Sequence, residues 1–498
     1  MRHTRTLRFL LPLLLFTVSL VAQPKQLVIL HTNDIHSSFV PHEAAWIKEN
    51  PKPMVGGFNE LSFVVDSIRK VNGEVLLLDA GDIMTGNPIT DYTYDGAEGG
   101  AVVEMMNRIR YDVWCPGNHD LDISLANLGK LTAVAKFPTV CANLQDEHGS
   151  LFFKNKPYTI ITRNGVKIGI IGIISQELYS LVNQNNLVGV KVASPVETVQ
   201  KYANELRAQV DLVIALTHQG VDEDVDMAKQ IHNVDIIVGG HSHTRLKAPR
   251  TVNGILIVQA GSNCENLGVL EVTVDHQAIT KSNGQLLQLW YTSNRPVTGL
   301  SKFIDSFEKK IDADYSEVIA TLTADWKRGE NGGSPLINFV ADAQREAAMA
   351  DVGYINVHGV RKDVSAGKIT KRDLFEVMPF RNVLVTFQLT GAQLKASVLN
   401  SIQNHAGIQL SGVKCIWKNE GDAIVFTTFL VGGKPLDEQK TYIAVASDYF
   451  MGEAKRYVGF DVPNKIFSNT TLFSAILNKA RAMKTIDPKE EFRIEQAR

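Results

Sequence analysis

The sequence is poor in several features that would point to a specialised class of protein. Only four cysteines occur in 498 residues, and Cys115, Cys141, Cys264 and Cys415 lie far apart with no Cys-x-x-Cys pair. This spacing excludes a dense disulfide scaffold and a cysteine-based metal site. We expect buried free thiols, and a bridge between Cys115 and Cys141 is the alternative if their strands are neighbours.

Charge of one sign is not in excess either. The chain has 51 Lys plus Arg and 53 Asp plus Glu, which gives a net charge of −2. A chain this close to neutral has no general basic field to hold a nucleic-acid polymer. Any anionic substrate must therefore be bound by local charges.

The chain also lacks an apolar run long enough to span a bilayer. Residues 9–21 are mainly apolar, follow Arg2, Arg5 and Arg8, and are followed by Ala22. A spanning helix needs ~20 apolar residues, and this run is shorter and contains Pro12. Because the layout is typical of a secretory signal, we predict a signal peptide over residues 1–22 and a periplasmic or secreted mature chain with no membrane span. A membrane anchor is the alternative.

What is present is the composition of an ordinary globular protein, with 44% hydrophobic and 21% charged residues. Short runs rich in Val, Ile and Leu alternate with polar turns and amphipathic stretches from residue 26 to about 295, which is typical of an α/β core. Residues 268–275 and 285–292 alternate and predict antiparallel strands. We predict a first domain over 23–298, a linker helix over 299–320 and a second α/β domain over 321–498, in which Ser334 and Pro335 start a helix.

Five turns of the first domain place acidic, amide or imidazole side chains directly after an apolar run. Because the crevice of an α/β sheet lies at the carboxyl ends of its strands, these turns can converge. Asp and His are good ligands for divalent ions, and glycines let the backbone come close. The turns are His31-Thr32-Asn33-Asp34-Ile35-His36, Asp79-Ala80-Gly81-Asp82, Gly117-Asn118-His119-Asp120, Thr217-His218-Gln219-Gly220 and Gly239-Gly240-His241-Ser242-His243.

The order Asp-x-His, Gly-Asp, Gly-Asn-His-Asp, His-x-Gly and Gly-His-x-His resembles the calcineurin-like dimetal phosphoesterases. The Thr-Asn-Asp-x-His opening, the export signal and the second domain are similar to the secreted 5′-nucleotidase and UDP-sugar hydrolase family. This resemblance implies a first domain built as a four-layer sandwich, in which helices flank two mixed sheets, and a smaller α/β domain that binds the substrate.

The resemblance also implies a site with two divalent metal ions, such as Zn²⁺ or Mn²⁺. It assigns Asp34, His36 and His243 to one ion, although some members have Gln at the position of His243. It assigns Asn118, His218 and His241 to the other ion, with Asp82 bridging the two. A carboxylate can span ions ~3.5–4 Å apart, and such a pair clamps a phosphate and lowers the pKa of bound water.

Two further residues of the first domain have a role implied by the family. His119 is expected to stabilise the developing charge or the leaving oxygen. Asp122, three residues further on, is expected to hold His119 charged and oriented. Asp120 matches an acidic position of the motif and is interpreted as a turn residue.

The second domain departs from the family pattern. Asn356-Val357-His358-Gly359-Val360-Arg361 keeps the end residues of the family's Asn-Gly-Gly-Gly-Ile-Arg segment, so Arg361 is predicted to contact phosphate, with Asn356 and Arg328 as weaker candidates. Tyr457 falls where the family has an aromatic ring that stacks on the base, but the Gly-rich turn that presents this ring is missing. Tyr449, Phe450 and Phe380 are expected in the core.

These features predict an exported dimetal phosphohydrolase that acts on a small phosphoester, either a nucleoside 5′-phosphate or a nucleotide-sugar pyrophosphate. The altered second domain leaves open cyclic nucleotides, sugar phosphates or thiosulfate-type esters as substrates of the same metals. A non-catalytic surface binding protein is the remaining alternative, and it is disfavoured because no ligand position is lost.

Overall fold

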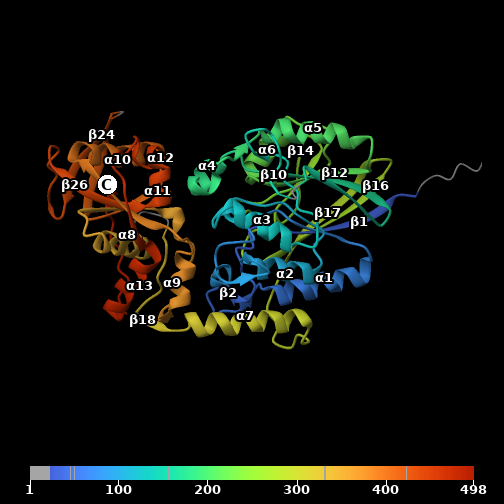
Figure 1. Ribbon diagram of the computed structural model, residues 1–498, viewed down its shortest axis with the longest axis horizontal. Coiled ribbons are helices and arrows are strands. Elements are labelled where there is room, and N and C mark those ends of the chain that lie inside the picture. Colours follow the sequence, from blue (N-terminus) through green and yellow to red (C-terminus); the bar gives the residue numbers. More distant parts are fainter. Residues whose placement is uncertain are drawn as a thin grey trace, which may run out of the picture.

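The chain folds into two α/β lobes that lie side by side (Figure 1). The computed structural model describes residues 23–44, 46–49, 51–153, 156–329, 333–421 and 423–497. The predicted signal peptide, residues 1–22, lies outside the described residues. Among those described, no helix is both long and apolar enough to cross a membrane. The four cysteines are buried and free, as the sequence predicts.

The first lobe contains a five-stranded mixed sheet in the order β17-β16-β1-β4-β7. Its central strand β1 pairs in parallel with β4 and antiparallel with β16, and β16 pairs antiparallel with β17. The antiparallel pair predicted from alternation is therefore confirmed. The strands are β1 (Lys25–Thr32), β4 (Leu76–Asp79), β7 (Val113–Trp114), β16 (Asn266–Asp275) and β17 (Ala278–Gln288).

A second mixed sheet of six strands has the order β14-β15-β13-β12-β10-β9. Its four inner strands run parallel, and β14 and β9 are antiparallel edge strands. The strands are β9 (Tyr158–Arg163), β10 (Val166–Ile174), β12 (Leu212–His218), β13 (Ile236–Val238), β14 (Arg250–Val252) and β15 (Ile255–Val258).

The two sheets pack face to face, which explains why their strands read as continuous apolar runs. Ile29 and Leu78 of the first sheet share a buried cluster with Ile168 and Ile214 of the second. Helices cover both outer faces, so the four-layer sandwich is confirmed. The covering helices are α1 (Phe58–Asn72), α2 (Gly100–Ile109), α3 (Leu125–Val134) and α7 (Gly299–Tyr315) on the first sheet, and α5 (Pro195–Arg207) and α6 (Val221–Ala228) on the second.

Short elements decorate this sandwich. They include β2 (His42–Glu43), β3 (Met54–Val55), β5 (Thr93–Tyr94), β6 (Ala97–Glu98), β8 (Leu144–Gln145), β11 (Lys191–Val192), α4 (Leu178–Leu181), and the 3₁₀ turns η1 (Pro88–Asp91), η2 (His119–Leu121) and η3 (Gln184–Leu187). Helix α7 packs on the core of the first lobe through Leu300, Ile304, Phe307 and Ile311. The domain boundaries at residues 298 and 320 stay predictions.

The second lobe is built on a five-stranded sheet in the order β22-β19-β26-β21-β27, with smaller sheets β20-β18-β28 and β25-β24-β23-β29 beside it. Its strands are β18 (Val318–Leu322), β19 (Val352–Asn356), β20 (Gly367–Thr370), β21 (Val383–Thr390), β22 (Ile408–Ser411), β23 (Val413–Glu420), β24 (Ala423–Val431), β25 (Lys434–Pro435), β26 (Thr441–Ser447), β27 (Ile466–Thr471), β28 (Thr485–Ile486) and β29 (Ile494–Gln496). Its helices are α8 (Pro335–Ala347), α9 (Lys371–Val377), α10 (Gly391–Asn404), α11 (Asp448–Gly452), α12 (Ala454–Val458) and α13 (Leu472–Met483), and the 3₁₀ turn η4 spans Val357–Gly359.

Helix α8 begins as the sequence predicts. The Ser334 hydroxyl accepts a hydrogen bond from the backbone N–H of Ile337, and Pro335 occupies the first turn, where a missing N–H costs nothing.

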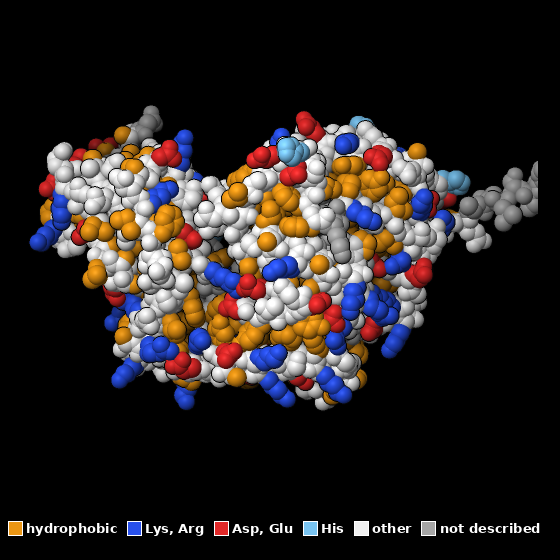
Figure 2. Space-filling view, in the orientation of Figure 1, with side chains coloured by type: hydrophobic (Ala, Val, Ile, Leu, Met, Phe, Trp, Pro, Cys, Tyr) orange, Lys and Arg blue, Asp and Glu red, His pale blue; other side chains and the backbone are white. Residues whose placement is uncertain are grey.

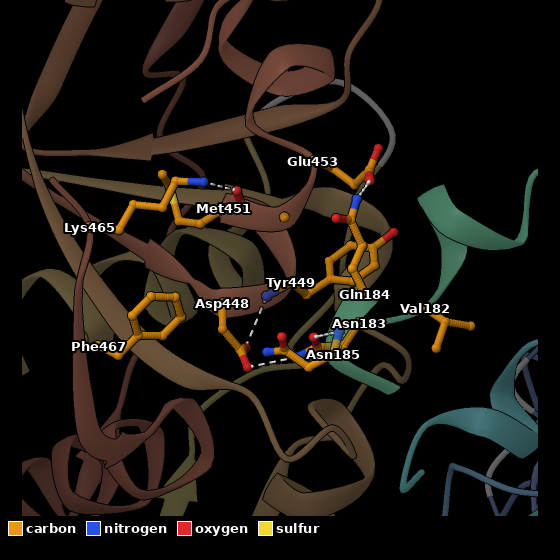
Figure 3. Close-up of a pocket in the computed structure, with 11 residues that line it drawn as sticks. Val182, Asn183, Gln184, Asn185, Asp448, Tyr449, Met451, Glu453, Lys465 and Phe467 are labelled. Atoms are coloured by element: carbon orange, nitrogen blue, oxygen red, sulfur yellow. Dashed lines mark hydrogen bonds between the residues drawn. The ribbon is translucent and has the colours of Figure 1, made fainter. Parts of the chain in front are cut away.

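Polar contacts join the lobes on the side of α4 and η3. Asn183 donates to Asp448 over 3.0 Å, and Tyr449 donates to the carbonyl of Ser180 over 2.8 Å. A cavity of about 120 Å³ lies beside these contacts, as Figure 3 shows. Because the Asp448 carboxylate also accepts from the backbone of Val383 and Tyr449, its oxygens are occupied by the protein, and the contact fastens the two lobes together.

The surface charge follows the composition. Among the described residues on the face drawn in Figure 2, Lys, Arg, Asp and Glu are interspersed and form no continuous basic strip.

Candidate metal centre

The five polar turns of the first lobe meet at one end of its two sheets. Asp34 and His36 follow β1, Asp82 follows β4, and Asn118 follows β7. His218 is the last residue of β12 in the second sheet, and His241 and His243 follow β13. Parallel strands end at the same edge of a sheet, so the turns from both sheets face each other across the crevice.

Two clusters of donor atoms lie in this crevice. The ligand atoms of Asp34, His36 and His243 lie within 4.8 Å of one another, and so do those of Asp82, His218 and His241. Asn118 belongs beside the second cluster, since its Oδ1 is 3.2 Å from His218 Nε2 and 3.0 Å from His241 Nδ1. The structure thus brings together all seven residues that the resemblance assigns to metals, and Asp82, which the resemblance assigns as a bridge, lies in the second cluster.

The histidine tautomers leave lone pairs pointing into these clusters. His36 Nδ1 faces the carbonyls of Met84 and Thr85 at 3.2 and 3.0 Å, so this nitrogen carries the proton. His218 Nδ1 donates in the same way to the carbonyl of Ala80 over 2.6 Å. Their Nε2 atoms face the clusters: His36 Nε2 lies 3.0 Å from His243 Nε2, and His218 Nε2 lies 3.1 Å from Asp82 Oδ2. Imidazole and carboxylate atoms gathered this closely can share a cation.

The buried carboxylates of the two clusters also favour a positive charge beside them. Asp34 Oδ1 is buried and has no hydrogen-bond partner among the described residues. Burial, with a smaller contribution from Asp82, raises the pKa of Asp34 to about 7. Burial would lower the pKa of His218, but the Asp82 and Asp34 carboxylates outweigh it and raise this pKa to about 10. The donor set therefore fits two divalent cations.

Three glycines fix the ring of His218. A Cβ atom would lie 2.8 Å from the ring at Gly81, 2.7 Å at Gly117 and 2.9 Å at Gly240, so none of these positions accepts a side chain. Gly81 and Gly240 approach Nδ1, and Gly117 approaches Cε1. The glycines of three separate motifs therefore form one cradle that aims a single imidazole.

The turns themselves are tight and strained. Five of the residues with donor atoms have left-handed backbone φ angles, which is rare for side chains other than glycine: Asp34 (51°), His36 (49°), Asp82 (57°), His241 (78°) and His243 (54°). Asp120 holds two of the turns, since its carboxylate accepts from the backbone N–H groups of Asp82, Met84 and Gly117 at 3.1, 3.0 and 2.8 Å.

His119 lies beside the first cluster and is oriented by a carboxylate. Its Nδ1 is 2.7 Å from Asp122 Oδ2, which also accepts from the hydroxyl of Thr85 over 2.7 Å. Its ring centroid lies 5.3 Å from that of His36. Burial lowers the pKa of His119, but the carboxylates of Asp122 and Asp82 outweigh it, so the net pKa is raised. Thr85 was not among the sequence candidates.

The second lobe contributes one guanidinium to this centre. Arg361 Nη2 lies 3.2 Å from His36 Nε2, although the two residues are 325 positions apart. Arg328 donates to the carbonyl of Arg361 over 3.0 Å and to Asp363 over 2.9 Å, so it supports the Arg361 loop. Asn356 is buried at the end of β19, and a Cβ at Gly359 would lie 3.2 Å from its side chain. Asn356 therefore also packs against the turn that leads to Arg361.

Three aromatic residues lie elsewhere than the sequence predicts. Tyr449, expected in the core, is only partly buried, and its hydroxyl donates to the carbonyl of Ser180 in the first lobe. Tyr457, the candidate for base stacking, is only 3% exposed and stacks on Phe450 with ring centroids 4.5 Å apart. Its ring is part of the second lobe's core and offers no face to a ligand, because the Gly-rich turn that would turn it outward is replaced by helix α12. Phe380, expected in the core, is only partly buried, and its ring centroid is 5.6 Å from that of His119.

Comparisons with known proteins agree with this geometry. A family model described as calcineurin-like phosphoesterase matches residues 27–245, and one described as 5′-nucleotidase, C-terminal domain, matches residues 317–461. Among curated proteins, Protein UshA of Yersinia enterocolitica is 28% identical over 478 residues, which cover 84% of this chain and 83% of the relative. A snake venom 5′-nucleotidase of Gloydius brevicauda is 27% identical and covers 88% of this chain and 83% of its own.

A solved structure is similar over nearly the whole chain. The 5′-nucleotidase precursor from Thermus thermophilus superposes with a TM-score of 0.83 at 26% identity, and the match covers 95% of this chain and 99% of that one. The likeness therefore includes both lobes.

Proposed function

Because the chain belongs to the calcineurin-like phosphoesterases that carry a 5′-nucleotidase C-terminal domain, we propose that it hydrolyses nucleoside 5′-phosphates. We extend the proposal to the pyrophosphate bond of nucleotide sugars, since the similarity to Protein UshA covers both domains. The observation that carries the proposal is the pair of facing donor clusters with the Arg361 guanidinium 3.2 Å from one of their nitrogens.

In this proposal Asp34, His36 and His243 hold one divalent ion, while Asn118, His218 and His241 hold the other. Asp82 would help to hold the pair, because a carboxylate has two oxygens and its charge would offset the repulsion between two cations. Two ions held by these residues would supply an activated water and neutralise phosphate charge. Mixed Asp, Asn and His donors suit Zn²⁺ or Mn²⁺.

The remaining residues act on the phosphate and the leaving group. Arg361 binds the phosphoryl oxygens, which a planar guanidinium can contact in pairs. His119 stabilises the leaving oxygen, and Asp122 keeps its ring charged and directed into the crevice. Arg328 and Asn356 are positioning residues for Arg361, since both contact its loop.

We also propose that the protein is exported before it acts. The support is the N-terminal sequence, in which three arginines precede the apolar stretch 9–21 and Ala22. Nucleotides outside the cytoplasm are then the expected substrates.

The decisive experiment is a substrate panel with Mn²⁺ and Zn²⁺ supplied separately to the purified protein. Phosphate release from AMP or cleavage of UDP-glucose supports the proposal, and failure on both removes it. Activity only on 2′,3′-cyclic AMP or p-nitrophenyl phosphate would reassign the substrate and keep the metals.

Arg361→Ala tests the phosphate contact within the same panel. A hydrogen bond to a charged group contributes about 1.5–3 kcal/mol, so kcat/KM for AMP should fall roughly ten- to 150-fold. Arg250→Ala, which removes an exposed arginine of the edge strand β14, is the matched control and should leave kcat/KM unchanged.

A further inference from the structure

Helix α9 of the second lobe carries a charged residue that the proposed mechanism does not use. The Glu376 side chain is only 15% exposed. Lys362 Nζ donates to its Oε2, and Arg372 Nε donates to its Oε1 over 3.0 Å. Burial would raise the pKa of Glu376, but the charges of Lys362 and Arg372 outweigh it and lower this pKa, so the carboxylate is ionised. Because a buried charge is costly unless it is paired, these contacts fix the segments that carry the two cations.

One of the two cations belongs to the loop that carries Arg361. Lys362 is the next residue in the chain, and the backbone N–H of Arg361 itself donates to the carbonyl of Val377 over 2.9 Å. Val377 follows Glu376 and ends α9. Two adjacent residues of α9 thus hold two adjacent residues of the loop, one pair through side chains and the other through the backbone. The position of Arg361 therefore depends on where α9 lies.

Helix α9 is in turn fastened to the first lobe, which it faces in Figure 1. Asn87 Nδ2 donates to Glu376 Oε1 over 3.4 Å. Two ion pairs lie on either side of this contact in the sequence, Arg372–Glu308 on α7 and Arg381–Asp91 at the end of η1. The first lobe therefore holds residues 372–381 at three points, with Glu376 in the middle.

The first-lobe side of this link packs against the metal-ligand candidate His36. Asn87 follows Thr85 and Gly86, and the Thr85 carbonyl faces His36 Nδ1 at 3.0 Å. A Cβ atom at Gly86 would lie 2.3 Å from the carbonyl oxygen of His36, so no side chain fits between the two segments. The Glu376 carboxylate thus contacts both the segment that packs on His36 and the residue next to Arg361. The Arg361 guanidinium in turn lies 3.2 Å from His36 Nε2.

We propose that Glu376 is a positioning residue, which sets the Arg361 guanidinium at the metal centre for contact with the phosphate of the substrate. This inference rests on the proposed function and adds the residue that fixes the phosphate contact across the two lobes. Glu376 acts through Lys362 and α9, because both of its oxygens are bound by protein groups. A displacement of about 1 Å at a reacting site can cost about 100-fold in rate, so a residue that fixes Arg361 matters without touching the phosphate.

The test titrates inorganic phosphate into the metal-loaded, full-length protein by calorimetry. Glu376→Gln and Lys362→Met each remove one charge of the pair, and each should weaken phosphate binding about 5- to 30-fold. Glu104→Gln is the matched control, because Glu104 is a buried glutamate whose partners Arg108 and Lys136 both belong to the first lobe. It should leave phosphate binding unchanged, and all three variants should retain two ions per chain.

A double-mutant cycle shows whether Glu376 acts through Arg361. In an Arg361→Ala background, Glu376→Gln should change the Kd for phosphate by about twofold at most, because the group that it positions is already absent. Losses that multiply would overturn the inference, since Glu376 would then act independently of the guanidinium.

Kinetics with AMP distinguish positioning from a loss of folded protein. A displaced phosphate contact should raise KM, whereas a partly unfolded sample loses kcat and keeps its KM. The inference is overturned by a fall in kcat alone, by loss of metal, by unchanged phosphate binding in either variant, or by equal weakening in Glu104→Gln. Wild-type protein that binds no phosphate would also overturn it. If the wild type binds phosphate and hydrolyses no ester, the proposed function fails, while the titration still decides the role of Glu376.

Discussion

The contact between His119 and Asp122 allows the sharpest test of the catalytic arrangement. Asp122→Asn keeps the shape of the side chain and removes the charge that faces His119 Nδ1 at 2.7 Å. A hydrogen bond to a charged group contributes about 1.5–3 kcal/mol, and each 1.36 kcal/mol is tenfold in rate. If this energy is expressed in the transition state, kcat for AMP should fall roughly ten- to 150-fold.

Three measurements separate this role from a structural one. Metal content should stay at two ions per chain, because the Asp122 carboxylate is outside both donor clusters. The pH at which kcat declines on the alkaline side should shift to lower pH, since the Asp122 carboxylate no longer supports the charged imidazole. In a His119→Ala background, which should itself lower kcat about 10²–10⁴-fold, Asp122→Asn should add little.

Asp226→Asn is the matched control, because Asp226 is an exposed aspartate that pairs only with the neighbouring Lys229 in the described structure. The reasoning is refuted if Asp122→Asn turns over AMP at the wild-type rate. It is also refuted if the losses from His119→Ala and Asp122→Asn multiply, since the two residues would then act independently.

Three further predictions concern other parts of the molecule. Asp82→Ala should abolish turnover and leave fewer than two ions per chain by elemental analysis, and two retained ions would contradict the bridging role. Burial raises the pKa of Asp224 to about 7 from the usual 3.8, so the folded form keeps this proton up to a higher pH than the unfolded chain does. The free energy of unfolding should therefore fall as pH rises from about 4 to 7, and Asp224→Asn should flatten that slope in denaturant titrations. Phe450→Ala should destabilise the second lobe by about 3–5 kcal/mol in urea unfolding, because it opens a cavity against Tyr457, whereas activity lost without such a shift would point to a ligand contact.

The two clusters of candidate metal ligands could be predicted from the sequence because the information is local. Each motif combines an apolar strand with donor side chains at its last residue or within the next five residues, and strand polarity alone brings such turns to the same edge. The antiparallel pair β16–β17 and the start of α8 follow from equally local patterns. The sharp turns at Asp34 and His241 could not be predicted, since a positive φ is uncommon for any residue other than glycine, although Asp and His adopt it more often than most.

The features that could not be predicted from the sequence depend on packing between distant segments. No periodicity relates Arg361 to His36, and only the contact of the two lobes sets their 3.2 Å separation. The prediction that Tyr457 stacks on a base was wrong because its position in a motif does not reveal its packing. In the fold the Tyr457 ring stacks on Phe450 inside the core of the second lobe.

The position of Arg361 has a consequence for how the gene of such a protein can recombine. Its guanidinium is encoded in the second lobe, yet its nearest partner at the metal centre is encoded in the first. If Arg361 binds phosphate as proposed, a gene fragment for either lobe alone would lack part of the phosphate site. Recombination that swaps one lobe must therefore preserve this contact together with the polar contacts beside α4 and η3.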